Sequence, residues 1–386
     1  GTEFGLFVTV DEGNHWVALD GGLPTIAVRD LDIQRRENDL ALGTFGRGFF
    51  ILDDYTPLRE ISAETMAEDA ALFPVKSAWR YIETSRLGLP TLDKAFQGDT
   101  FYTAPNPPFG AVFTYHLKDG LKTRQERRLE AEKRAEEQNA TLPYPNQEAL
   151  RAEDEERDPS IVLTVRDADG KVVQRVTGPR GKGLHRVAWD LRYPSPRPTD
   201  PDPGPSAPWD SPRVGPLVLP GAYSVTLEQE VDGVVTQLAG SQSFEVVDLG
   251  GGTLPVDDPA AALEFQRRAA ELQRAVLGAV EVTAEVKSRI EHLRHAIVDT
   301  PEATPDQLAE LVAIDGDLND LLVVLRGDRR RAKRNEPVDP SIVGRVNRVV
   351  EGQLSTTQPP TNTSRDGYRW ASEAFAGTLE DLRALD

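Results

Sequence analysis

The sequence predicts a multidomain protein that is mainly β with α, in which sheets come first along the chain and helices last. Three observations support this: a repeat of short strands at the amino end, alternating apolar residues such as Tyr223, Val225 and Leu227, and helical periodicity from Pro259 onward. At about 100 to 200 residues per domain, 386 residues correspond to two or three folded units.

Composition narrows the classes of partner. With 63 acidic and 44 basic side chains the net charge is -19, so the field of the protein repels phosphate backbones and anionic lipid. We therefore expect no nucleic-acid partner. The chain has no cysteine, which excludes disulfides and thiolate zinc sites, and no run approaches the roughly 18 apolar residues of a membrane span.

The amino end contains an internal repeat. GTEFGLFVTVDEG begins at Gly1 and GTFGRGFFILDD begins 42 residues later at Gly43. A period of about 40 to 50 residues with several short strands is typical of a β-propeller blade, so residues 1–71 are predicted to be the last blades of a propeller. The predicted strands are 5–10, 16–19, 28–34, 39–44, 48–52 and 57–61.

A turn motif lies between the first two predicted strands. The segment TVDEGNHW resembles the Asp-box of sialidase-like BNR repeats, with Thr9 in place of Ser and His15 in place of Thr. Asp11 is expected to accept hydrogen bonds from the turn amides, Gly13 to supply a positive φ, and Trp16 to pack back as an apolar plug. We assign these residues a structural role rather than a catalytic one.

The predicted blades are too few to form a closed propeller, which needs about four to eight. The sequence starts at Gly1 and has its one methionine at Met66, so we expect it to begin inside a longer reading frame, with the missing amino-terminal blades as a partner. Arg29, Asp30 and Arg47 flank the blade strands. Salt bridges between blades are the favoured role for them, and ligand binding at a central channel is the alternative.

The middle of the chain, residues 72–250, is predicted to be an immunoglobulin-like or fibronectin-like β-sandwich. An insertion at 119–159 is rich in helix formers and predicts a helical hairpin. Its few apolar residues, including Leu121, Leu129 and Leu150, predict shallow docking on the sandwich, and a functional arm is the alternative. A proline-rich loop at 194–220 predicts an extended cover over a sheet edge. The predicted strands are 101–103, 111–117, 161–166, 172–177, 185–190, 221–230 and 242–247.

Residues 257–386 predict an antiparallel helical bundle, with helices from Pro259, at 305–325, at 340–354 and at 365–385. Self-association through helix 259–298 is the alternative, because its apolar positions form a long seam. The seam residues are Phe265, Ala269, Leu272, Val276, Ala279, Thr283, Val286, Ile290, Leu293 and Ile297.

The sequence shows no recognisable catalytic residue, metal site or cofactor-binding motif. The segment 315–320 lacks the glycine and the distal carboxylate of a calcium loop, and it lies within a helical pattern. His292 and His295 have no apparent third ligand, and the basic run 329–334 is expected to be a solvated linker. Nucleophile-elbow, Walker and dinucleotide motifs are absent from the sequence.

Four segments carry a resemblance to a known family, namely VRDLDIQRRENDLALGTFGRGFFILDD, NPPFGAVFTYHLKD, HRVAWDLRYP and GPLVLPGAYSVTL. On these segments the chain resembles the carboxyl-terminal part of bacterial sortilin-like (VPS10-like) BNR-repeat propeller proteins, which are often labelled glycosyl hydrolases. The resemblance implies a secreted or periplasmic protein and transfers no catalytic residue. We expect a non-catalytic region that binds protein or glycan. The alternative is an accessory region of a sialidase-like or glucanase-like hydrolase whose catalytic residues lie in the missing blades.

Overall fold

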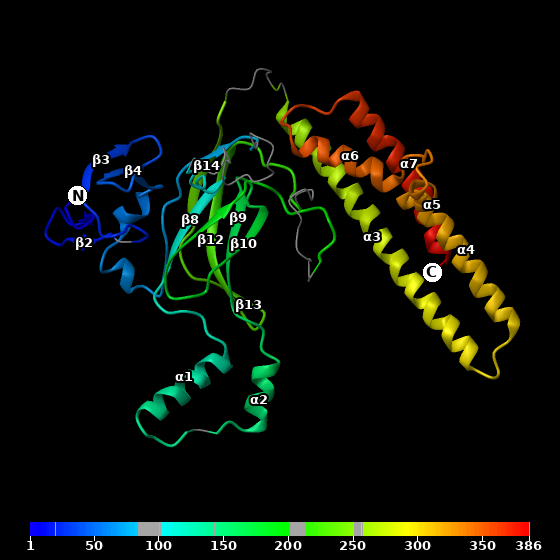
Figure 1. Cartoon of the computed structure of the whole chain (residues 1–386), viewed down its shortest axis with the longest axis horizontal. Coiled ribbons are helices and arrows are strands. Elements are labelled where there is room, and N and C mark those ends of the chain that lie inside the picture. The colour runs from blue at the N-terminus through cyan, green and yellow to red at the C-terminus, as the bar shows by residue number, and fades with distance from the viewer. Residues whose placement is uncertain are drawn as a thin grey trace. The chain divides into compact units, whose positions relative to one another are not determined.

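The computed structural model describes residues 1–19, 21–83, 100, 102–142, 144–200, 213–250, 256 and 258–385. It is a mixed α/β protein with several sheets and a carboxyl-terminal helical region (Figure 1). Its contacts divide it into two compact units. The sheet unit comprises Gly1–Tyr81, Asp93–Leu191 and Pro220–Leu249, and the helical unit comprises Ile82–Leu92, Arg192–Leu219 and Gly250–Asp386.

Two small sheets form the amino end. A two-stranded sheet and a three-stranded sheet of order β3-β4-β5 enclose a small core of Leu6, Val28 and Leu42. The strands are β1 (Phe7–Val8), β2 (Val17–Ala18), β3 (Val28–Gln34), β4 (Asp39–Thr44) and β5 (Phe49–Leu52). The strand predicted at 57–61 is wrong, because Thr56–Glu60 is a 3-10 helix. Pro57 has no N–H to donate to a ladder and suits a first helical turn.

The sequence repeat at the amino end is also a repeat of local structure. The N–H and the Oγ1 of Thr2 both donate to the carbonyl of Gly5, at 2.9 and 3.1 Å. The same two groups of Thr44 donate to the carbonyl of Gly48, at 3.1 and 2.7 Å. Both glycines have positive φ, +131° and +73°, a region that side chains with a Cβ rarely adopt.

Two larger sheets pack face to face. One has the order β10-β9-β12-β14-β7 with β13 paired to β12, and it curls into a half-barrel; the other has the order β11-β8-β6 (Figure 1). Aromatic rings join their inner faces, with Phe113 of β8 and Phe244 of β14 at 5.7 Å and Trp189 of β11 and Tyr223 of β12 at 5.7 Å. The strands are β6 (Ala70–Leu72), β7 (Ala78–Arg80), β8 (Ala111–Leu117), β9 (Ser160–Asp167), β10 (Val172–Gly178), β11 (Gly183–Trp189), β12 (Gly221–Val231), β13 (Val234–Gln237) and β14 (Gln242–Asp248).

Three of these strands were not predicted from the sequence. β6 and β7 have three residues each and β13 has four, so they are too short to show alternation. β7 pairs parallel with β14, which departs from the antiparallel pairing typical of the predicted immunoglobulin-like sandwich. The guanidinium of Arg80 fastens this pair by donating to both carboxylate oxygens of Asp248, at 2.6 and 3.1 Å. Residues 102–103, predicted to be in a strand, are irregular.

The insertion forms the predicted pair of helices, α1 (Arg124–Glu137) and α2 (Gln147–Asp154). A capping box of Thr123 and Glu126 starts α1. Arg128 of α1 donates to both carboxylate oxygens of Glu153 of α2, at 2.8 and 2.9 Å.

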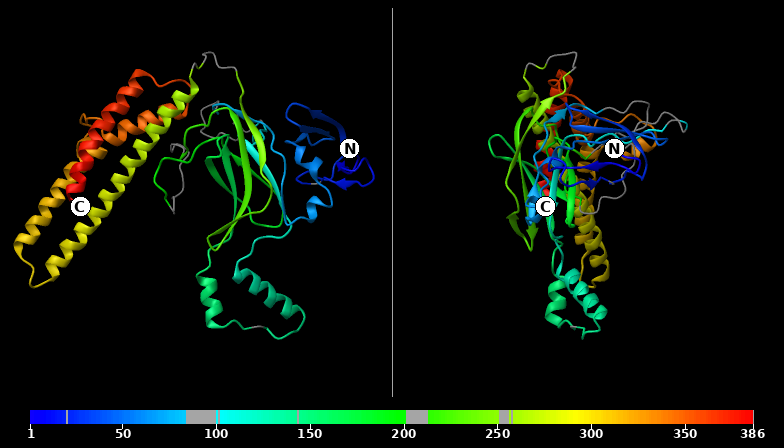
Figure 2. Two further views of the ribbon diagram at one scale, coloured as in Figure 1. Left: turned by 180° about the vertical axis from the view of Figure 1, so that it is seen from behind. Right: turned by 90° about the vertical axis from the view of Figure 1, so that its left-hand side faces the viewer.

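Charged contacts, rather than leucines, hold the insertion to the sheets. Leu129 and Leu150 are 50% and 37% exposed, so the predicted shallow apolar docking is wrong for these two residues. Arg180 instead donates to the Glu126 carboxylate at 3.1 Å. Both figures show α1 and α2 pointing away from the sheets (Figures 1 and 2).

The helical unit packs four long helices around one core. α3 contacts α4, α6 and α7 through the predicted seam, and Figure 2 shows α3 and α4 side by side. Of the seam residues, Leu293 is the most exposed, at 52%. Helices of the same chain therefore cover the surface that the predicted self-association would use. The helices are α3 (Pro259–Asp299), α4 (Pro305–Arg326), α5 (Arg329–Lys333), α6 (Ile342–Leu354) and α7 (Asn362–Leu385).

Three further features of the helical unit bear on the predictions. The expected linker 329–334 contains the short helix α5, which Asp328 caps. The segment 315–320 lies inside α4, where Asp315 pairs with Lys287 of α3. Within the part of the chain that the structure describes, no helix is both long enough and apolar enough to cross a bilayer.

Part of the proline-rich loop groups with the helices. The sequence placed 194–220 in the sheet domain, whereas contacts assign Arg192–Leu219 to the helical unit. Arg274 of α3 donates to the carbonyls of Pro196 and Ser195 at 3.4 and 3.3 Å, and the guanidinium of Arg267 lies 5.0 Å from the ring centre of Tyr193. Residues 201–212 of the loop lie outside the described residues.

Candidate functional site

A cleft of about 540 Å³ lies within the sheet unit, beside the turn that joins β3 to β4. We call it the turn cleft. Its walls come from segments far apart in the sequence, and they combine charged and aromatic side chains. Among the residues that line it are Arg36, Glu37, Asp39, Asp53, Asp54, Lys76, Trp79, Tyr81, Phe109 and Arg186. Its volume lies in the range of small-molecule sites, roughly 300 to 1,000 Å³.

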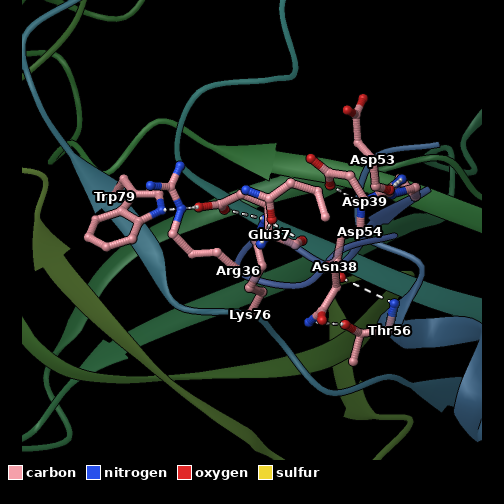
Figure 3. A network of polar contacts seen from close by, with 11 residues as sticks. Arg36, Glu37, Asn38, Asp39, Asp53, Asp54, Thr56, Lys76 and Trp79 are labelled. Atoms are coloured by element: carbon pink, nitrogen blue, oxygen red, sulfur yellow. Dashed lines mark hydrogen bonds and ion pairs between the residues drawn. The ribbon is translucent and has the colours of Figure 1, made fainter. Parts of the chain in front are cut away.

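Glu37 fastens one wall of the cleft. Its Oε1 accepts from the indole N–H of Trp79 at 3.0 Å and from Nε of Arg36 at 2.9 Å, and its Oε2 accepts from Nζ of Lys76 at 2.9 Å (Figure 3). Burial opposes the ionisation of Glu37, but the hydrogen bonds from Lys76 and Trp79 outweigh it and hold its pKa below the usual value. Because its carboxylate is fully engaged, Glu37 joins the β3–β4 turn to β7 rather than serving a ligand.

The backbone of the turn explains why Glu37 points at β7. The N–H of Glu37 donates to Oε1 of Gln34 at 2.8 Å, which closes the turn. Asn38 follows with a φ of +58°, a left-handed conformation that asparagine tolerates better than most residues. Its side chain donates to Oγ1 of Thr56 at 3.0 Å, so the turn is also tied to the 3-10 helix (Figure 3).

A second wall is acidic. The N–H of Asp54 donates to Oδ1 of Asp39 at 2.9 Å, and Oδ1 of Asp54 accepts from the N–H of Thr56 at 3.2 Å. Asp54 is buried, with a φ of +45°. These contacts give Asp54 a structural role in the turn that follows β5.

Asp53 differs from its neighbours. Its side chain makes no hydrogen bond to the residues that the structure describes, although its backbone carbonyl accepts from Nη1 of Arg186 at 2.8 Å. Burial, followed by the negative charge of Asp39, raises the pKa of Asp53 above its usual value, and the charges of Arg186 and Lys76 oppose that shift. The cleft therefore holds a partly desolvated carboxyl group whose oxygens are open to a ligand.

Aromatic rings line another side of the cleft. Tyr81 and Phe109 meet edge to face, with ring centres 4.8 Å apart and an interplanar angle of 79°. Gly110 sets the position of this segment: its φ is +103°, and a Cβ there would lie 1.9 Å from the carbonyl oxygen of Trp189. Only glycine allows so close an approach to β11.

The Asp-box residues form a hydrogen-bonded turn that is separate from the turn cleft. Oδ1 of Asp11 accepts from Oγ1 of Thr9 at 2.8 Å and from the N–H of His15 at 2.9 Å, and Gly13 has a φ of +92°. The N–H of Gly13 also donates to Oγ1 of Thr9 at 2.9 Å. None of these residues lines the turn cleft.

Two side chains of the Asp-box turn differ from expectation. Trp16 is 60% exposed and donates its indole N–H to the carbonyl of Gly13 at 3.1 Å, so the predicted packing of its ring is wrong. Nδ1 of His15 lies 2.5 Å from Oδ2 of Asp11. The backbone and side-chain hydrogen bonds from His15, followed by that from Thr9, lower the pKa of Asp11 to about 2.

The three candidate ligand-binding residues are not brought into the cleft. Arg29, Asp30 and Arg47 are exposed, and none of them forms an ion pair within the described part of the chain. The favoured salt bridges between blades therefore stay a prediction. The guanidinium of Arg29 instead lies 5.1 Å from the ring centre of Phe45, and Asp30 accepts from the N–H of Leu31 at 2.9 Å.

Neither a search for metal ligands nor comparison with known proteins assigns a function to the cleft. In the described ranges, no group of three or more His, Asp or Glu side chains is placed to hold a metal ion. No protein-family model matches the chain, and comparisons with curated proteins and with solved structures also returned no match.

Proposed function

We propose that the chain is the non-catalytic, carboxyl-terminal region of a larger sortilin-like BNR-repeat propeller protein, secreted or periplasmic, that binds a protein or a glycan. The observation that supports this most strongly is the exposed apolar surface of the repeat sheets. Large side chains of β5 and of its flanking turn face solvent, with Phe49 84%, Phe45 68% and Ile51 64% exposed.

Such a surface is unusual for a sheet that functions alone. Apolar surface in water is unfavourable by roughly 25 cal/mol per Å², and native proteins protect long exposed sheet edges. In a propeller, neighbouring blades cover the faces of each sheet. The shared hydrogen bonds of Thr2 and Thr44 support the same idea, since they indicate two copies of one structural unit. The missing blades are the partner that we propose for this surface.

The other parts of the chain fit an accessory, ligand-presenting role. The two face-to-face sheets support an immunoglobulin-like or fibronectin-like sandwich, although the parallel β7 departs from that pattern. The packing of α3, α4, α6 and α7 on one core supports an antiparallel bundle.

Hydrogen exchange tests the propeller part of the proposal. In the monomeric chain, amides of residues 1–58 should exchange much faster than those of β9 and β12, because the blades lack their neighbours. Exchange of the same amides should slow when the polypeptide carries further repeats. Equal protection of both regions in the monomer would contradict the proposal.

An activity screen separates the proposal from its alternative. The chain and a longer polypeptide with the additional repeats should both leave chromogenic glycosides intact. Hydrolysis by the longer polypeptide alone would favour an accessory region of a glycoside hydrolase.

A further inference from the structure

We propose that the turn cleft binds a neutral saccharide, with Tyr81 and Phe109 against the ring and with Asp53 and Arg186 on its hydroxyl groups. This inference names the ligand class for the glycan-binding role proposed above and rests on it.

The charges of the cleft nearly balance, since Arg36, Lys76 and Arg186 face four acidic residues, Glu37, Asp39, Asp53 and Asp54. Glu37 pairs with Lys76 and Arg36, at 2.9 Å in each case. Asp54 is buried and accepts a backbone hydrogen bond. Asp53 and Arg186 keep hydrogen-bonding capacity to spare, because the Asp53 carboxylate accepts no bond from the described residues and Arg186 uses Nη1 on a backbone carbonyl.

These two groups carry opposite charges and act on each other, since the charge of Arg186 opposes the upward pKa shift of Asp53. A phosphate or carboxylate ligand would face Asp39 and Asp53, and a cationic ligand would face Arg186 and Lys76. A hydroxyl group both donates and accepts hydrogen bonds, so it suits a carboxylate and a guanidinium side by side. Neighbouring hydroxyl groups of a sugar satisfy both at once.

The aromatic wall favours a ring-shaped ligand with an apolar face. Tyr81 is 40% exposed, and its contact with Phe109 is edge to face, so one ring of the pair can present its face to the cleft. The face of an aromatic ring carries partial negative charge and attracts the C–H groups of a pyranose. Val112 and Ala188 extend the apolar lining.

Asp53 also destabilises the folded protein when it is ionised, because burial and Asp39 both oppose its charge. An asparagine of the same shape would avoid this effect. Functional residues often lower the stability of the folded protein. Asp53 fits a ligand-binding role because it has this effect and its carboxylate oxygens remain open to the cleft.

The test is saturable binding of neutral oligosaccharides to the whole chain. The probes are maltotriose, cellotriose, xylotriose and N-acetylchitotriose, with sialyllactose as the anionic comparison, and the readouts are saturation-transfer NMR and calorimetry. At least one neutral probe should bind, and sialyllactose should bind more weakly. Tyr81→Ala and Phe109→Ala should each weaken binding about tenfold.

Asp53→Asn distinguishes a ligand-binding role from a structural one. It should weaken binding about tenfold while the thermal midpoint at neutral pH stays level or rises, so a folding defect cannot account for the loss. Tyr144→Ala is the matched control, because this tyrosine of the helical insertion is 93% exposed and outside the cleft. It should leave binding unchanged.

The outcomes separate this inference from the function on which it rests. No saturable binding by any neutral probe overturns the saccharide cleft and leaves the propeller test by hydrogen exchange untouched. Binding that survives Tyr81→Ala, Phe109→Ala and Asp53→Asn overturns the cleft assignment while glycan binding stands. Tighter binding of sialyllactose than of every neutral probe overturns the predicted ligand class.

Discussion

Replacing Glu37 by alanine should loosen the three-stranded sheet β3-β4-β5 from the larger sheets. Glu37 is 18% exposed at its side chain and accepts hydrogen bonds from Lys76 and Trp79, which belong to the segment around β7. The substitution removes both acceptors at once and leaves a partly buried ammonium and an indole N–H without this partner.

The free energy lost in Glu37→Ala follows from the number of these hydrogen bonds and from how deeply they are buried. Hydrogen bonds to a charged group contribute about 1.5 to 3 kcal/mol each. The Lys76 side chain is 31% exposed and keeps its bond to the backbone carbonyl of Glu37, so the lower end applies. Arg36 is 71% exposed and adds almost nothing. We therefore expect a loss of about 3 kcal/mol, or roughly 150-fold in an opening equilibrium.

Hydrogen exchange with mass spectrometry measures this loss directly. Peptides from β3 and β4 should exchange up to about 150-fold faster in Glu37→Ala, whereas peptides from β9 should change little. Glu37→Gln should show a smaller effect, because its amide oxygen still accepts from Trp79. Glu64→Ala, at an exposed position without a side-chain capping bond, is the control. If Glu37→Ala and Glu64→Ala behave alike, Glu37 does not hold the sheet.

Four further outcomes are expected. The pKa of Asp11 is about 2 in the folded protein, compared with an ordinary value of 3.8, so ionised Asp11 stabilises its turn above pH 3.8. This stabilisation should disappear as the pH falls toward 2, and NMR titration of His15→Ala should show an Asp11 pKa closer to 3.8. The raised pKa of Asp53 destabilises the fold above pH 3.8, so Asp53→Asn should raise the thermal midpoint at neutral pH, and this gain should vanish in acid. Leu318→Ala, at a fully buried position of α4, should lower the free energy of unfolding by about 3 to 5 kcal/mol in urea titrations. Gly110→Ala should give little folded protein at 37 °C, because its Cβ would lie 1.9 Å from a carbonyl oxygen of β11.

The sequence predicted the elements whose pattern is long or chemically marked. The bounds of β3, β4 and β8 match the predicted strands, because alternation over six or seven residues ends at clear turn residues. A capping residue followed by proline, Asp258-Pro259 and Thr304-Pro305, placed the starts of α3 and α4. Local rules therefore decided these elements.

The turn cleft depends on contacts that no local rule encodes. Asp53 and Arg186 are 133 residues apart and meet only because β8 and β11 pack beneath the turn after β5. Glu37 lies in a stretch of charged turn residues, and its role depends on β7, a three-residue strand without a periodic signal. The predicted site residues were instead those with a motif, Asp11 and its neighbours, or with charge beside a strand, such as Arg29.

The parallel pairing of β7 with β14 constrains how the protein is made. Arg80 and Asp248 are separated by 168 residues, so β7 leaves the ribosome long before its partner exists. At about 5 to 20 residues per second, synthesis of the intervening chain takes roughly 10 to 30 s. During that interval β7 has an unsatisfied edge, and the helical insertion emerges before the sheet can close. The order of translation thus makes the pairing of β7 with β14 a late event in folding. Until β14 is synthesised, chaperones can bind the unpaired β7.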